Sequence, residues 1–189
     1  MSSGTVSPRY TISENTDGTG NLDIKDPVLF RFVHQLMTQQ IAIVKLVNIS
    51  QPVPSSFFQK IVDEINKAYS SGLYTSTWVC LRKLFENLLI ELLRRKYGTA
   101  RVEIYFNTAE SRFNDFSVLI TNLSNNVRDF SSYTSGFDQS FFNFLSNFRE
   151  QANRTAHSID IIEDFQRIEK LANLINQYCD LICGVIGKI

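Results

Sequence analysis

The chain has 189 residues, of which 43% are hydrophobic and 20% are charged, so it suits one globular domain, or a domain with an appendage, that buries a proper core. Lys plus Arg and Asp plus Glu both number 19, which gives a formal net charge of zero. Because a protein that coats nucleic acid by bulk charge is usually basic, these totals argue against non-specific DNA binding and leave room only for a local cationic patch.

The chain carries few residues suited to disulfide or metal chemistry. Its 3 cysteines show no Cys-x-x-Cys spacing, and its 2 histidines are too few for a histidine-rich metal site. We therefore expect reduced cysteines, no metal and no cofactor. No charged-then-apolar leader and no run of about 18 apolar residues occurs, which predicts a cytoplasmic protein that makes no membrane contact.

The first 25 residues are polar and rich in Ser, Thr, Gly and Asn. This composition favours a disordered tail, although the turn residues at 17–20 also permit a small β-hairpin. Residues 26–189 are predicted to form the helical domain. Asp26-Pro27 is typical of an N-cap followed by proline, and predicts a helix from there to about Asn48.

Two helices are predicted after a break at residues 51–55. Ser55 or Ser56 can cap the first, which runs to about Ser70. The second, from about Tyr74 to Tyr97, has the longest apolar pattern in the chain. Its buried face is predicted to consist of Leu81, Leu84, Phe85, Leu88 and Leu92.

Two charged residues of this second helix, Arg82 and Glu86, lie beside the apolar face instead of opposite it. On a helical projection they fall roughly 80–120° from the centre of that face, next to Leu89 and Leu93. Charged groups in such a position need a partner. Either Arg82 and Glu86 pair with each other across i, i+4, or one of them meets a polar stripe on a later helix.

After residue 98 the sequence contains several short secondary-structure patterns. Residues 102–106 alternate as a strand does, but no partner strand is evident. A helix is predicted from about Phe113 to Arg128, followed by a polar loop at 131–136. Ser135 and Asp138 have the spacing of a capping box for the next helix.

That next helix carries the polar stripe. Its buried face is predicted to contain Phe141, Phe144, Leu145, Phe148 and Ala152. Arg149, Asn153 and His157 follow each other at i, i+4, so they share one slowly drifting line on the helix surface. After His157, Ser158 and Asp160 offer a new N-cap for a last helix that runs to about Val185.

This arrangement predicts an all-α fold, an up-and-down helical bundle of about five to six helices. His157 falls at the junction of the last two helices, near the exposed backbone amides of the second, which is a suitable place for an anion.

Two stretches together resemble the HEPN superfamily, and the resemblance covers about residues 50–186. The first is Gly72 to Leu89 with its Arg82-x-x-x-Glu86 pair, and the second is residues 148–157 with Arg149-x-x-x-Asn153-x-x-x-His157. The resemblance implies a bundle that often dimerises across the helices bearing the motif. Many members are metal-independent endoribonucleases of toxin–antitoxin or antiviral defence systems. Others bind RNA or nucleotide without cleaving it.

The resemblance also implies a site made of His157, Arg149, Asn153 and Arg154, supported by the Arg82/Glu86 pair. An imidazole can move a proton near neutral pH, and a guanidinium can hold a phosphate bidentately, which together suit cleavage to a 2′,3′-cyclic phosphate. The usual spacing in the family is Arg, about four to six residues, then His. Here seven residues separate Arg149 from His157, and two separate Arg154 from it.

Two function classes stay open. In the first, the chain is a homodimer that binds RNA or nucleotide, with endoribonuclease activity and an antitoxin or defence-system protein as partner. In the second, it is a non-catalytic protein-interaction or dimerisation module, and the same polar residues brace the helix junction.

Overall fold

The computed structural model describes residues 10–14, 20–29, 45–157 and 165–189, and the chain divides into two compact units, Met1–Ile43 and Val44–Ile189. In the first unit, β1 (Tyr10–Glu14) and β2 (Gly20–Ile24) pair antiparallel, with Tyr10 opposite Ile24. The N-terminal residues therefore include the hairpin, and not only the tail that their composition favours. The predicted boundary at residue 25 stays a prediction.

The predicted N-cap at Asp26 is confirmed. Its Oδ1 accepts hydrogen bonds from the backbone N–H groups of Val28 at 2.9 Å and Leu29 at 3.2 Å, and residues 27–29 are helical. The predicted continuation of this helix over residues 30–44 lies outside the described residues. Its predicted end near Asn48 is wrong, because residues 45–50 are not helical.

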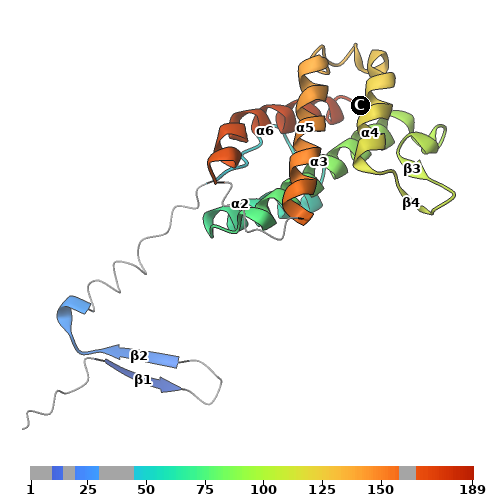
Figure 1. Cartoon of the computed structure of the whole chain (residues 1–189). Coiled ribbons are helices and arrows are strands. Elements are labelled where there is room, and N and C mark those ends of the chain that lie inside the picture. The colour runs from blue at the N-terminus through green and yellow to red at the C-terminus, as the bar shows by residue number, and fades with distance from the viewer. Residues whose placement is uncertain (1–9, 15–19, 30–44, 158–164) are drawn as a thin grey trace, which may run out of the picture. The chain divides into compact units, whose positions relative to one another are not determined.

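The second unit is an all-α helical bundle, as predicted (Figure 1). Its central helix is α3 (Tyr74–Tyr97), which packs against all four of the others. The bounds of α2 and α3 agree with those predicted from the apolar pattern. The surrounding helices are α2 (Ser56–Ser70), α4 (Phe116–Asn125), α5 (Gln139–His157) and α6 (Phe165–Ile186).

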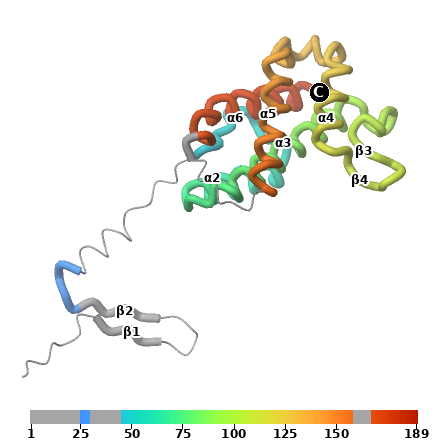
Figure 2. The backbone as a smooth tube through the Cα atoms, viewed as in Figure 1, coloured from blue at the N-terminus to red at the C-terminus, as the bar shows by residue number. Residues whose placement is uncertain are grey.

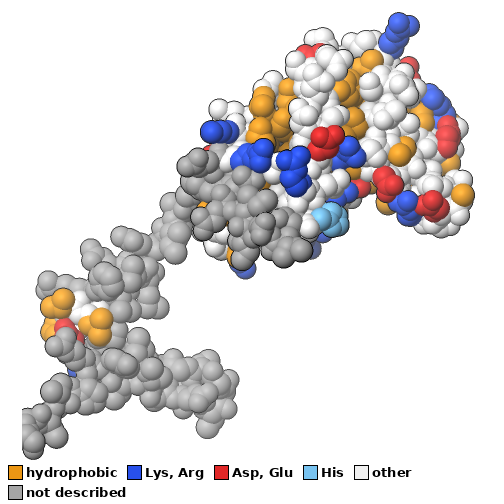
Figure 3. Space-filling model, viewed as in Figure 1, with side chains coloured by type: hydrophobic (Ala, Val, Ile, Leu, Met, Phe, Trp, Pro, Cys, Tyr) orange, Lys and Arg blue, Asp and Glu red, His pale blue; other side chains and the backbone are white. Residues whose placement is uncertain are grey.

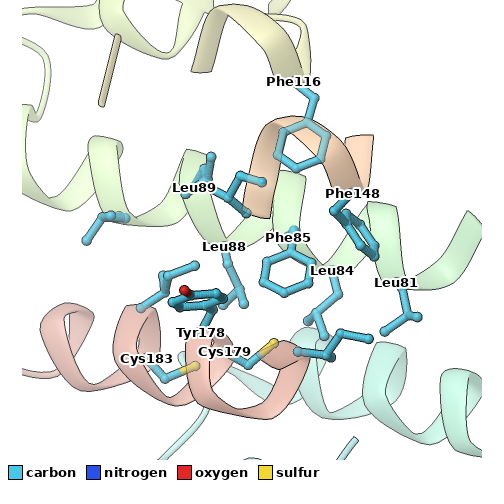
Figure 4. Packing of buried hydrophobic residues seen from close by; sticks show 14 of the residues in the cluster. Leu81, Leu84, Phe85, Leu88, Leu89, Phe116, Phe148, Tyr178, Cys179 and Cys183 are labelled. Atoms are coloured by element: carbon cyan, nitrogen blue, oxygen red, sulfur yellow. The ribbon is translucent and has the colours of Figure 1, made fainter. Parts of the chain in front are cut away.

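The core surrounds α3 on more than one side. Every residue of its predicted buried face is fully buried, and so are Trp78, Leu89 and Leu93. Figure 4 shows the side chains of α3 between Tyr178 and Cys179 of α6 and Phe148 of α5. Because so much of α3 is covered, Arg82 and Glu86 lie at the margin of the core, where each is half-buried.

Helices α3 and α5 pack antiparallel through aromatic rings. The ring of Trp78 lies 5.4 Å from that of Phe148, and the ring of Phe85 lies 5.7 Å from that of Phe144 and 5.0 Å from that of Phe148. All five predicted core residues of α5 are buried. Phe148 thus lies between two aromatic side chains of α3 and fixes the level at which the two helices meet.

The region between α3 and α5 differs from its prediction. Most of the residues that alternate as a strand does are not in a strand, because Val102–Ile104 forms a 3₁₀ turn. Only Phe106 belongs to one, β3 (Phe106–Asn107), which pairs with β4 (Arg112–Phe113) (Figure 2). Since Phe113 belongs to β4, α4 begins at Phe116 and not at the predicted position. A second 3₁₀ turn, Val127–Phe130, follows it.

The capping box predicted from Ser135 to Asp138 is wrong. Asp138 caps α5 itself, because its Oδ1 accepts the backbone N–H of Phe141 at 2.9 Å. The second capping signal, after His157, lies outside the described residues.

An extended segment, residues 45–51, enters the bundle between α2 and α6. Asn66 of α2 accepts the backbone N–H of Val47 at 2.9 Å and donates to its carbonyl at 2.8 Å. Asn176 of α6 makes the same two-sided contact with neighbouring backbone groups, at 2.7 and 2.9 Å. Asp180 Oδ1 accepts two more backbone N–H groups, at 2.6 and 3.0 Å. These side chains replace the hydrogen bonds that a helix would supply, which explains why the helix predicted here does not form.

Candidate functional site

The predicted polar stripe lies on the C-terminal half of α5. Arg149, Asn153 and His157 all belong to this helix, and His157 is its last residue. The Arg149 side chain is 28% exposed, Asn153 is half-buried, and Arg154 and His157 are exposed. The stripe therefore begins at the packed edge of α5 and ends in solvent, and Figure 3 shows Lys and Arg side chains gathered over this part of the molecule near a His side chain.

Helix geometry separates the guanidinium of Arg149 from that of Arg154, which lies beside the stripe on the same helix. A rise of 1.5 Å per residue places His157 about 12 Å along the axis from Arg149 but only about 4.5 Å from Arg154. At 100° per residue, Arg149 and Arg154 lie on either side of His157, roughly 80° and 60° away. Arg154 is thus the guanidinium nearer to the imidazole, although the resemblance gives no preference between the two.

The ion pair of Arg149 is a weak one. Its Nη2 lies 3.6 Å from Oε1 of Glu150, and the Glu150 side chain is 61% exposed. An exposed pair of this kind contributes about 0–1 kcal/mol. A guanidinium has five N–H donors, so this contact leaves Arg149 able to bind an anion.

The supporting pair on α3 lies at the same level as Arg149. Arg82 falls between Trp78 and Phe85, whose rings both contact Phe148, and Arg149 follows Phe148 in the chain. Within the described residues, no hydrogen bond or ion pair joins Arg82 or Glu86 to the stripe, and none joins them to each other. Helix packing alone brings the Arg82/Glu86 pair to the level of the polar stripe. No described hydrogen bond or ion pair links the pair to the stripe.

A third charged residue near Arg82 was missed from the sequence. Desolvation by burial raises the pKa of Glu86; the positive charge of Arg82 opposes this rise, and the negative charge of Asp115 adds to it. A hydrogen bond from Arg112 lowers the pKa of Asp115, and Arg82 lowers it further. Arg82 therefore lies in the field of two carboxylates, one on α3 and one at the start of α4. An Asp before an apolar run is a helix-start signal, and the expected start at Phe113 obscured it.

Three buried polar atoms have no hydrogen-bond partner among the described residues: Trp78 Nε1, Arg82 Nε and Asn153 Oδ1. Two of these residues belong to the predicted site. A buried polar atom without a partner costs about 1–3 kcal/mol, and folded proteins contain few of them. Violations of this kind are expected at functional or strained sites.

The site offers guanidinium, amide, imidazole and carboxylate groups. In the part of the chain that the structure describes, no three His, Cys, Asp or Glu side chains gather closely enough to hold a metal ion. In the same residues, none of the helices combines the length and the apolar character needed to cross a membrane.

Comparison with known proteins identifies no relative. No family model, no curated protein and no solved structure matches this chain. The resemblance to the HEPN superfamily therefore stays a prediction that rests on the residues quoted for it.

Proposed function

We propose that this chain is a HEPN-like domain that binds RNA or a nucleotide through the C-terminal half of α5. The observation that supports the proposal is the line of Arg149, Asn153 and His157 on one helix. Beside it lie two buried atoms, Asn153 Oδ1 and Arg82 Nε, that have no partner among the described residues. Cations and an imidazole bind phosphate, and an amide at the packed edge supplies a directional hydrogen bond. The zero net charge suits a local site and not a coat of bound nucleic acid.

The roles follow from position along the helix. Arg154 is close enough along the axis to hold the phosphate on which His157 acts. Arg149, about two turns away, would hold another phosphate of the same ligand. Asn153 lies between them and orients the ligand or the imidazole. Arg82, flanked by Glu86 and Asp115, supports the packed edge of the site from α3.

Cleavage of RNA is the catalytic part of the proposal. His157 accepts the proton of the ribose 2′-hydroxyl, and the 2′-oxygen forms a bond to phosphorus while the bond from phosphorus to the 5′-oxygen breaks. The leaving 5′-oxygen takes up a proton from water, and His157 returns its proton to solvent. The products are a 2′,3′-cyclic phosphate and a 5′-hydroxyl. Arg154 stabilises the charge that develops on the phosphate oxygens.

Assembly and context are also part of the proposal. A homodimer would bring two copies of the stripe together and double the local positive charge. In a toxin–antitoxin or defence system, an antitoxin or another system protein would cover this surface and control it.

A non-catalytic protein-interaction or dimerisation module is the second candidate. The half-buried position of Asn153 favours it, because an amide at the packed edge of a helix also serves as a brace. In that case the half-buried Asn153 contributes to stability and not to binding.

The test compares the full chain with single variants in an RNA-binding assay. Arg149→Ala and Arg154→Ala should each weaken binding about tenfold, as expected for loss of a phosphate contact. Arg128→Ala is the matched control, because Arg128 is exposed but lies on the 3₁₀ turn after α4. If the wild-type chain binds neither RNA nor nucleotide, or if all three variants bind alike, the proposal is wrong.

Catalysis is tested separately. Structured RNA incubated with the protein in EDTA should yield 2′,3′-cyclic phosphate ends, and His157→Ala should abolish them without loss of binding. Cleavage that persists in His157→Ala would come from a contaminant or another site. Binding without cleavage in the wild-type protein would leave a non-catalytic domain. Size-exclusion chromatography measures the homodimer.

A further inference from the structure

A second feature lies on the other flank of α5. Helices α5 and α6 border a groove of about 520 Å³, within the range of small-molecule sites. Asn147, which lines it, is two residues from Arg149, so the two point about 160° apart on the helix. The groove is therefore separate from the polar stripe, and nothing in the proposed function uses it.

The floor of the groove is aromatic. Phe144, Phe148 and Tyr178 line it, and their rings already contact one another: Phe144 lies 5.7 Å from Phe148 and 4.8 Å from Tyr178. Leu174 adds an apolar wall that is 37% exposed. Rings arranged in this way offer stacked and edge-to-face partners to another ring.

The rim of the groove is neutral or positive. Arg167 of α6 lies on it together with the amide of Asn147, and no described lining residue carries a carboxylate. A guanidinium has five donors, so Arg167 can bind an anion in addition to its other contacts. Figure 3 shows hydrophobic side chains gathered over α6 beside α5, with Lys and Arg side chains next to them.

We infer that this groove is a binding site for a small organic anion that carries an aromatic ring. The ring packs on the aromatic floor against Leu174, and the anionic group lies near Arg167 and accepts a hydrogen bond from the amide of Asn147. An aliphatic ligand would leave the stacking capacity unused, and a neutral ring would make no charge-assisted contact with Arg167. Aryl carboxylates and nucleotides share this chemistry.

Anilinonaphthalene sulfonate is the probe, because it joins aromatic rings to an anion and becomes fluorescent when bound. We expect saturable binding of one molecule per chain of the folded full-length protein. Leu174→Glu places a carboxylate on the wall and should weaken binding at least about tenfold by charge repulsion. Val118→Glu adds the same charge at a 42% exposed position of α4, outside the groove, and should change binding less than about twofold.

A second variant keeps the test decisive if Leu174→Glu unfolds, which its thermal melting curve will show. Arg167→Gln removes the cation, so it should weaken binding of the sulfonate but not of neutral aminonaphthalene. Benzoate and adenosine monophosphate as competitors distinguish the two sources of the anion. Absence of saturable binding, or equal binding by the Leu174→Glu and Val118→Glu variants, would overturn the inference. RNA binding by the stripe should not change in Leu174→Glu, so the two proposals fail independently.

Discussion

Asn153→Leu separates a binding site from a brace, because the two predict opposite changes in stability. The side-chain oxygen of Asn153 is buried without a partner among the described residues. Leu has the same branched arrangement of heavy atoms as Asn, although its volume is larger. Replacing Asn by Leu removes that unsatisfied acceptor and should raise the free energy of unfolding by about 1–3 kcal/mol. For a chain of this length the melting temperature should rise by about 2–4 °C per kcal/mol.

Helix propensity must be subtracted from this change. Leu is a better helix former than Asn by a few tenths of a kcal/mol, wherever the substitution lies. Asn147→Leu supplies the control, because Asn147 lies on the same helix but is exposed, so its change reports propensity and surface effects alone. The difference between the two variants isolates the buried oxygen.

The assay is scanning calorimetry combined with the RNA-binding measurement. If Asn153 serves a ligand, Asn153→Leu is more stable than the wild-type protein and binds RNA at least about tenfold more weakly, a loss of about 1.4 kcal/mol. A fall in melting temperature with unchanged RNA binding would refute the reasoning, and would show that the amide braces the junction.

Three further predictions concern other parts of the bundle. Asn66→Ala removes both hydrogen bonds to the extended segment and should destabilise the protein by about 2–5 kcal/mol in urea denaturation, whereas a loss below about 0.5 kcal/mol would mean the segment does not need them. Burial raises the pKa of Glu86, so the folded state binds the proton of this carboxyl more tightly than the unfolded state does. The contribution of Glu86 to stability is therefore complete below its pKa in the unfolded state. It is lost as the pH rises through its pKa in the folded state. Glu86→Gln should therefore melt higher than the wild type at neutral pH but not at pH below about 4; a gain that is independent of pH would contradict this. Burial raises the pKa of all three cysteines, to about 12 for Cys183, but only Cys80 is accessible, since Cys179 and Cys183 are buried. A thiol reagent at about pH 8 should therefore label only Cys80 before unfolding, and rapid labelling of all the cysteines would show that the core opens.

Helices that depend on local signals could be predicted from the sequence. The bounds of α2 and α3 follow from apolar periodicity between proline, serine and glycine breaks, which are all close in the chain. The buried face of α5 follows from the same rule. These elements needed no knowledge of their neighbours.

The errors occur where distant residues decide the backbone. Residues 45–50 read as the end of a helix, but Asn176 and Asp180, about 130 positions away, hold them extended. β3 gains its partner only when residues 112–113 turn back onto it. Apolar periodicity and helix propensity depend only on neighbouring residues, so they do not register contacts between residues far apart in the chain. Here they predict the wrong type of secondary structure.

For the candidate site, the alignment of its three residues on one helix face could be predicted from the sequence, but the residues packed around them could not. The i, i+4 spacing places Arg149, Asn153 and His157 on one helix face without tertiary information. The field of Asp115 at Arg82, and the absence of a described partner for the Asn153 oxygen, depend on how α3, α4 and α5 pack.

The hydrogen bonds to residues 45–51 have a mechanical consequence. Chain tension arriving from the N-terminal unit would reach this segment first, and Asn66, Asn176 and Asp180 would divide the load between two helices that are far apart in sequence. These hydrogen bonds therefore hold the first described residues of the second unit against both α2 and α6.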